Sequence, residues 1–168
     1  VAQHGVATPR WQYVEKLEEL EHARVTFPVI VKPNFEGSSK GITQDSVVEE
    51  PGALAPKVAA MLQRYPAGVL VEEFIVGRDV TVPYLEHLAD EKCQGVLAPT
   101  EYLIDEGKAG PRKHAIYDYD LKTTAEHAVS VRAPALLAPE VESAIRSAAR
   151  KVFHVLDCRD LGRIDFRV

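Results

Sequence analysis

Cysteine is scarce in this chain, and its two cysteines follow no metal-binding pattern. Cys93 and Cys158 stand alone among 168 residues, outside any CxxC pair, and the six histidines form neither an HExxH nor an HxxxH motif. This spacing argues against a disulfide framework and against a zinc motif of closely spaced ligands. The two cysteines are therefore interpreted as reduced thiols of a cytoplasmic protein.

The chain also lacks long apolar runs and an excess of positive charge. Hydrophobic residues make up 46% and charged residues 27% of the sequence, and the net charge is −5. No run reaches the length of a membrane span, and the negative balance gives no general attraction to nucleic acid or to an anionic membrane. A chain of this length suits one compact domain or two small lobes.

Neither common phosphate-binding motif, GxxxxGK[ST] or GxGxxG, is present, but one stretch has related chemistry. Phe27–Val31 predicts a buried strand rich in β-branched residues, which ends at Lys32 and Pro33. The loop 36–41 that follows contains glycine and serine, whose backbone and hydroxyl groups can surround phosphate oxygens. An ordinary strand followed by a Gly/Ser turn has the same pattern, so this stretch alone leaves both interpretations open.

The rest of the chain predicts alternating helices and strands. We expect helices at 15–23, from Ser46 to Arg64 and at 139–156, the second one starting with a capping box between Ser46 and Glu49. Strands are expected at 11–14, 69–71, 80–85, 95–98, 102–104 and 162–168. The short connection between 69–75 and 80–85 predicts an antiparallel β-turn-β unit, and the charged, glycine-rich segment 105–113 predicts a mobile loop without regular structure.

Charged residues recur at the ends of the predicted strands. Lys32 ends the first, Glu72 and Glu73 end the second, and Arg163 and Asp165 lie on the last. Each alone is consistent with an ion pair or a solvated strand edge. Together, a cation, a serine loop, an acidic hinge and a late aspartate suit a nucleotide with Mg²⁺.

Four segments resemble one family in order and separation. They are FPVIVKPNFEGSSKGI (27–42), VLVEEFIVGRDVTV (69–82), YDYDLK (117–122) and CRDLGRIDF (158–166). With them the chain resembles the ATP-grasp carboxylate–amine ligases and, within these, the D-alanine–D-alanine ligases. The resemblance implies an α+β fold of two lobes with the nucleotide site between them. It also implies a linker from a missing N-terminal domain at 1–10, a small central lobe at 11–76 and a truncated large lobe at 77–168.

The resemblance also assigns roles to individual residues. Nucleotide binding falls to Lys32, Ser38, Ser39, Glu72, Glu73, Phe74, Ile75, Asp79 and Lys122. Within this set Lys32 and Lys122 would contact the nucleotide phosphates, and the serine loop would close over these phosphates. The segment Glu72–Ile75 would receive the adenine, and Asp79 would bind the ribose. Arg163 would stabilise the anionic tetrahedral intermediate, which makes it a catalytic residue together with Ser38 and Ser39. Asp165 would be a ligand of Mg²⁺ or Mn²⁺.

The implied activity is ATP-dependent ligation of two amino acids through an acyl phosphate. The favoured reaction is that of D-alanine–D-alanine ligase in peptidoglycan biosynthesis, in the cytoplasm. The protein catalyses such a reaction mainly by positioning the substrates and neutralising charge, because it takes little part in the covalent chemistry itself. The implied partners are ATP and small amino acids, with no nucleic acid and no membrane. Whether the protein forms a homodimer through regions outside this chain is left open.

The sequence departs from the family pattern at three points. Thr123 stands where the YDYxxKY loop of the family has its final tyrosine, near the substrate. The acidic residue and the earlier nucleotide-contacting lysine of the family's N-terminal part have no match. The family's remaining metal ligands, a Glu and an Asn, fall beyond Val168. We therefore expect part of a longer enzyme, inactive by itself. Thr123 keeps open a ligase for other amino acid or hydroxy acid substrates, and a non-catalytic nucleotide-binding domain is a further alternative.

Overall fold

A computed structural model describes residues 1–22, 25–88 and 93–168 of the chain. The chain divides into two compact units, each of which is described by itself. Unit 1 comprises Val1–Thr8, Val76–Ile104 and Val129–Val168, and unit 2 comprises Pro9–Ile75 and Asp105–Ala128. The segment 105–128 thus belongs with the first part of the chain, whereas the division by sequence assigned all of 77–168 to one lobe.

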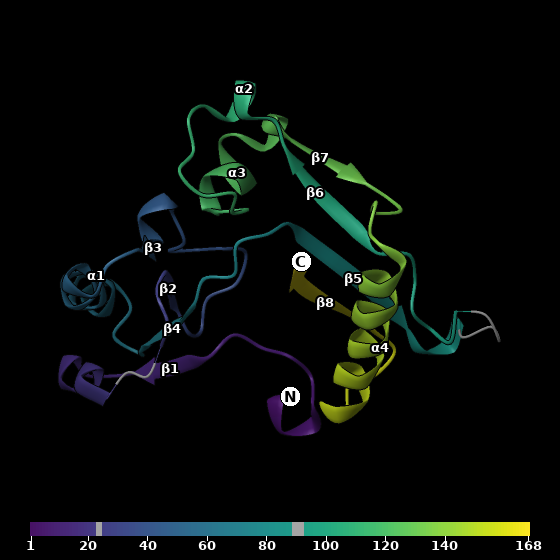
Figure 1. Ribbon diagram of the computed structural model, residues 1–168, viewed down its shortest axis with the longest axis horizontal. Coiled ribbons are helices and arrows are strands. Elements are labelled where there is room, and N and C mark those ends of the chain that lie inside the picture. Colours follow the sequence, from purple (N-terminus) through teal and green to yellow (C-terminus); the bar gives the residue numbers. More distant parts are fainter. Residues whose placement is uncertain (23–24, 89–92) are drawn as a thin grey trace. The chain divides into compact units, whose positions relative to one another are not determined.

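Unit 2 contains an antiparallel sheet of four strands in the order β1-β4-β2-β3 (Figure 1). These strands are β1 (Trp11–Val14), β2 (Val29–Pro33), β3 (Val47–Val48) and β4 (Val69–Glu73). Val29 and Val31 on β2 and Val69 and Val71 on β4 are fully buried, which leaves the alternate residues on the other face. The predicted strand that carries Lys32 is confirmed, and it extends through Pro33.

Helix α1 (Pro51–Arg64) covers the buried face of this sheet. Leu54, Val58 and Met61 recur at helical spacing and join the valines of the strands in one core. The predicted end at Arg64 is correct, but the predicted start at Ser46 is wrong. Ser46 ends the 3₁₀-helix η3 (Gln44–Ser46), where it forms a capping box with Thr43. The β-branched pair of β3 comes next, and α1 begins at Pro51, whose missing N–H costs nothing in a first turn.

The remaining elements of unit 2 are short helices. They are the 3₁₀-helices η2 (Leu17–His22) and η5 (Glu126–Ala128) and the α-helices α2 (Glu106–Ala109) and α3 (Tyr119–Thr123). The predicted helix 15–23 is therefore a 3₁₀-helix, and Ala23 lies outside the described residues. The prediction that 105–113 lacks regular structure is wrong, because Asp105 caps α2 by accepting a hydrogen bond from the Gly107 N–H.

Unit 1 contains a second antiparallel sheet, in the order β7-β6-β5-β8. Its strands are β5 (Asp79–Leu85), β6 (Thr100–Ile104), β7 (Val129–Arg132) and β8 (Leu161–Arg167). The expected strand at 102–104 is β6, whereas the expected strand at 95–98 is reduced to an isolated bridge from Val96 to Tyr84. The predicted β-turn-β pairing of β4 with β5 is wrong, since the two strands belong to different sheets. A short connection does not enforce a hairpin when both edges of each strand have other partners, as β4 has in β1 and β2 and β5 has in β6 and β8.

Helix α4 (Pro139–Val155) packs on β5 and β8 and confirms the clearest helix of the sequence (Figure 1). Ile145, Ala149 and Phe153 form its buried face, and the Phe153 ring stacks on Tyr84 with 4.1 Å between centroids.

Unit 1 also contains the 3₁₀-helices η1 (Ala2–His4) and η4 (Glu86–Leu88). The α+β class is confirmed, because each unit combines an antiparallel sheet with helices. None of the helices within the described ranges has the length and apolar character that crossing a membrane requires.

Candidate functional site

Lys32 and Glu72 form an ion pair on adjacent strands of unit 2. The Lys32 Nζ lies 2.5 Å from the Glu72 Oε1, and the two side chains are 30% and 18% exposed. Lys32 lies opposite Leu70, and Glu72 lies opposite Ile30, so the pair is diagonal across the β2–β4 ladder. Two residues predicted from separate motifs are thus brought together by strand pairing.

The acidic segment after Glu72 is held by backbone hydrogen bonds. The Glu73 N–H donates to the Arg10 carbonyl at 2.9 Å, and the Phe74 N–H donates to the Pro28 carbonyl at 2.8 Å. The Glu73 carboxylate accepts from the N–H groups of Thr26 and Arg10, both at 3.3 Å. The hydrogen bonds from Thr26, ahead of those from Arg10, hold the pKa of Glu73 below its ordinary value.

The loop 36–41 makes a tight turn at the two predicted serines. Ser38 and Ser39 have φ values of 54° and 58°, and the Lys40 N–H donates to the Gly37 carbonyl at 3.0 Å. Positive φ at both central residues is the pattern of a type I′ turn, which serine adopts at a conformational cost. Gly41 has a φ of 77°, and a Cβ there would lie 2.7 Å from Pro33 Cγ, so the loop returns close to the end of β2.

The segment 105–128 is tied to this loop within unit 2. The Ser39 hydroxyl donates to the Tyr117 carbonyl at 2.9 Å, and the Lys122 Nζ lies 4.8 Å from the centroid of the Tyr117 ring. The Tyr119 N–H donates to the Ile42 carbonyl at 3.1 Å. Ser39 and Lys122, predicted from separate motifs, thus contact the same residue.

A buried arginine fixes the start of α3. Arg112 pairs with Asp118, and their side chains are 6% and 2% exposed. Asp118 also accepts from the Gln44 amide at 3.1 Å and caps α3 through the Leu121 N–H at 3.2 Å. Arg112 could not be selected from the sequence, because an arginine in a charged, glycine-rich segment gives no sign of burial.

The residues predicted in unit 1 lie on β5 and β8. Thr81, 4% exposed, donates its hydroxyl to the Asp165 Oδ1 at 2.6 Å, and the Arg163 Nε lies 3.2 Å from the same oxygen. At the end of the strands, Asp79 is paired with Arg167, with 3.0 Å between Oδ2 and Nη1. Strand register explains both contacts, since Thr81 lies opposite Asp165 and Asp79 opposite Arg167. Thr81 could not be selected from the sequence, because only the pairing of two distant strands brings it to Asp165.

Asp165 is suited in part to hold a divalent cation. Its side chain is 65% exposed, and the contacts with Thr81 and Arg163 both use Oδ1. Carboxylate oxygens are the ligands that Mg²⁺ prefers, but one carboxylate does not complete its coordination. Asp165 therefore fits the predicted metal role as one ligand of a set.

Known proteins with similar sequence or fold include D-alanine–D-alanine ligases and a D-Ala:D-Ser ligase. A D-alanine–D-alanine ligase of Nocardia farcinica is 37% identical over 152 residues, which are 90% of this chain and 39% of that protein. The VanG D-Ala:D-Ser ligase of Enterococcus faecalis has a TM-score of 0.68 at 25% identity, over 99% of this chain and 45% of that one. D-alanyl-alanine synthetase A of Vibrio cholerae has a TM-score of 0.71 at 21% identity, over 99% of this chain and 48% of that one. This chain thus spans less than half the length of each.

These comparisons confirm the predicted α+β ATP-grasp fold and the resemblance on which it rested. The family model described as D-ala D-ala ligase C-terminus matches residues 1–168. This chain therefore belongs to the D-alanine–D-alanine ligase C-terminal family.

Proposed function

We propose that this chain is the nucleotide-binding part of an ATP-dependent ligase that joins two amino acids through an acyl phosphate. The favoured reaction is the D-alanine–D-alanine ligation of bacterial cell-wall synthesis, carried out in the cytoplasm. The observation that carries the proposal is the family match over all 168 residues. The charged residues that the reaction requires, including Lys32, Lys122, Arg163 and Asp165, support it.

In unit 2, the proposed role of Lys32 and Lys122 is to neutralise the nucleotide phosphates. Lys32 is partly buried and oriented by Glu72, so its ammonium group loses little freedom when it meets an anion. The turn at Ser38 and Ser39 presents backbone N–H groups and the Ser38 hydroxyl next to the end of β2, whereas the Ser39 hydroxyl holds the Tyr117 carbonyl. The segment Glu72–Ile75 is proposed to receive the adenine. Its residues Glu73 and Phe74 are already fixed by hydrogen bonds to the Arg10 and Pro28 carbonyls.

In unit 1, Asp79 is proposed to bind the ribose hydroxyls, Asp165 a divalent cation and Arg163 the developing negative charge. A bound Mg²⁺ supplies charge neutralisation and orientation of the phosphates. Thr81 holds the Asp165 carboxylate in place, and Arg163 presents a guanidinium on the same face of β8. A fixed cation near a tetrahedral oxyanion lowers the barrier because it needs no reorganisation during the reaction. Exclusion of water would protect the acyl phosphate from hydrolysis.

A second candidate is a ligase whose second substrate is another amino acid or a hydroxy acid. Thr123 favours it, because it replaces the tyrosine that the family places near the substrate. The Thr123 hydroxyl donates to the Tyr119 carbonyl of its own helix at 2.8 Å. Threonine is smaller than tyrosine, and a hydroxyl that donates to its own helix does not offer that proton to a substrate.

Calorimetry with a non-hydrolysable ATP analogue and Mg²⁺ tests the nucleotide proposal on the 168-residue chain. We expect saturable binding to the wild type and its loss in Lys32→Ala, with an unchanged unfolding curve. A folded wild type that binds no nucleotide would contradict the proposal that this chain carries the nucleotide site.

Substrate choice is tested separately, on the complete ligase. Phosphate release is measured with D-alanine as the first substrate and with D-alanine, D-serine or D-lactate as the second. A preference for D-alanine supports the first proposal, and a preference for D-lactate or D-serine supports the second. Replacing Thr123 by tyrosine should shift the preference toward D-alanine if Thr123 determines it.

A further inference from the structure

Three side chains able to bind a metal meet in unit 1, at the opposite end of β5 and β8 from Asp79 and Asp165. Glu86 and His87 begin η4, directly after β5, and Asp160 directly precedes β8. Because β5 and β8 are antiparallel, with Leu85 opposite Leu161, these three residues lie at the other end of the strand pair from Asp165. Asp160 precedes Asp165 by five residues, which corresponds to about 16 Å along an extended chain.

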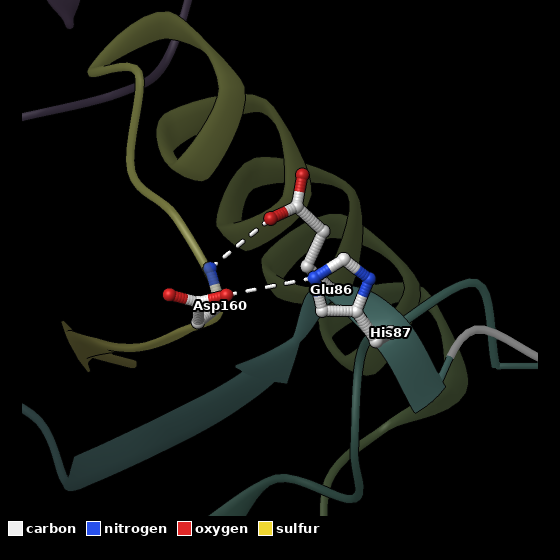
Figure 2. Close-up of side chains that lie close together, drawn as sticks. All are labelled: Glu86, His87 and Asp160. Atoms are coloured by element: carbon white, nitrogen blue, oxygen red, sulfur yellow. Dashed lines mark hydrogen bonds and ion pairs between the residues drawn. The ribbon is translucent and has the colours of Figure 1, made fainter.

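The backbone holds Glu86 and Asp160 against each other. The Glu86 N–H donates to the Asp160 carbonyl at 2.8 Å, and the Asp160 N–H donates to the Glu86 Oε2 at 3.0 Å. Figure 2 shows the three side chains converging, with the His87 ring directed toward the Asp160 carboxylate. The distance from His87 Nε2 to Asp160 Oδ1 is 3.5 Å, and one donor atom from each residue lies within 4.8 Å of the other two.

These distances are close to those of a transition-metal site. Ligand atoms about 2.1 Å from a tetrahedral Zn²⁺ lie about 3.4 Å from one another. The His87–Asp160 pair already has this spacing. Because both of these side chains are 79% exposed, they have room to rotate toward the Glu86 carboxylate, which lies within 4.8 Å.

The surrounding pocket adds further donors of the same kind. An open pocket of about 430 Å³ is lined by Glu86, His87, His154, Asp157, Cys158, Arg159 and Asp160. Three of these residues are carboxylates, two are imidazoles and one is a thiol, and Arg159 is the one permanently charged cation among them. A mixture of nitrogen, oxygen and sulfur donors suits Zn²⁺, whereas Mg²⁺ and Ca²⁺ prefer oxygen alone.

We propose that Glu86, His87 and Asp160 bind one Zn²⁺ ion, with a fourth position open to water or to a neighbouring donor of the pocket. The ion joins η4 to the loop before β8 and so stabilises this end of unit 1. It is separate from the metal proposed at Asp165, because its ligands lie at the opposite end of the strands and include an imidazole.

Calorimetry and thermal unfolding with Zn²⁺ alone, without nucleotide, test this site on the 168-residue chain. We expect one Zn²⁺ per chain and a higher Tm with the metal, since an ion that binds only the folded state stabilises it. His87→Ala and Asp160→Asn should each weaken binding by about tenfold or more, since loss of even a group that only orients a ligand costs about this much. Asparagine tolerates the positive φ of 63° at position 160, so that variant removes charge without straining the backbone.

Two further variants distinguish Zn²⁺ at this site from Zn²⁺ bound elsewhere on the chain. His127→Ala removes an exposed histidine of unit 2, and Asp165→Asn removes the proposed Mg²⁺ ligand, and both should bind Zn²⁺ as the wild type does. Substituting Co²⁺ should give visible absorption bands that are lost in His87→Ala. The proposal is overturned if Zn²⁺ does not bind, if His87→Ala and Asp160→Asn bind it as tightly as the wild type, or if Asp165→Asn alone abolishes binding.

Discussion

Lys32 Nζ lies 2.5 Å from Glu72 Oε1, across the two central strands of the unit 2 sheet. The pair joins Lys32, near the end of β2, to Glu72 in the acidic segment of β4, 40 positions later. A partly exposed ion pair adds little to stability, about 0.5 kcal/mol after screening by solvent. Its value is positional, because it holds the ammonium group at the end of β2 next to the serine turn.

Glu72→Gln should therefore weaken nucleotide binding much less than Lys32→Ala does. A lost charge-assisted hydrogen bond corresponds to about a tenfold to hundredfold loss of affinity for Lys32→Ala. Glutamine keeps an acceptor oxygen, so we expect a loss of about threefold or less for Glu72→Gln. Calorimetry with the ATP analogue gives both values, with the exposed Lys16→Ala as the charge-matched control. Equal losses in the two variants would mean that Glu72 itself is essential to the site.

Substitutions at Ser38 and Ser39 should distinguish the role of the backbone conformation in this turn from the role of the Ser39 side chain. Ser38→Gly suits the φ of 54° and should leave the loop conformation intact. Ser39→Ala removes the 2.9 Å hydrogen bond to the Tyr117 carbonyl and should speed amide hydrogen exchange in 36–41 and 116–123 together. Exchange measured by mass spectrometry checks both variants. Faster exchange in only one of the two segments would show that Ser39 does not couple them.

Much of this architecture could be predicted from the sequence, because its strongest local signals agree with the fold. The apolar spacing of α4 and the β-branched residues of β2 gave correct elements. Local reasoning failed where pairing is decided at long range. The short link between β4 and β5 predicts a hairpin, yet each strand pairs with segments far away in the chain.

The same limit applies to the candidate site. Lys32 and Asp165 could be selected from motifs, since charges at strand ends are conspicuous. Thr81 could not, because it supports Asp165, which lies 84 residues away in the chain. Arg112 could not for a different reason, since its partner Asp118 is near in the sequence but the burial of both side chains depends on the fold. A threonine in a strand and an arginine in a charged segment give no local signal of such contacts.

Thr81→Val should raise the Mg²⁺ concentration needed for nucleotide binding. The buried Thr81 hydroxyl donates to the Asp165 Oδ1 at 2.6 Å, so without this hydroxyl the carboxylate is less firmly held in position. We expect an increase of about threefold to tenfold in the half-saturating Mg²⁺ concentration, in line with the loss of one hydrogen bond. Binding without Mg²⁺ should be unchanged, and Thr81→Ser should behave as the wild type. A uniform loss with and without Mg²⁺ would point to a structural role only.

Arg112→Met should destabilise the chain strongly, although it lies in a segment that the sequence presents as a loop. Removing one partner of a buried ion pair costs about 3 kcal/mol or more, because the other charge stays buried. Asp118 keeps its contacts with Gln44 and Leu121, so the loss should lie near the lower limit. Urea unfolding measures it, with Lys108→Met as control, since Lys108 pairs with Asp105 at an exposed position in the same segment. Equal effects of the two substitutions would argue against a buried Arg112.

Acid should destabilise the hinge through Glu73. Hydrogen bonds from Thr26, then from Arg10, lower its pKa in the folded state, so the unfolded chain binds a proton more readily than the folded one does. The stabilisation is fully present above the ordinary glutamate pKa of about 4.3 and is lost as the pH falls through the lower folded value. Unfolding curves of the wild type and Glu73→Gln between about pH 3 and 7 should therefore converge toward low pH, since glutamine does not titrate. A stability difference between the two proteins that does not change over this range would show that the Glu73 charge contributes nothing to the hinge.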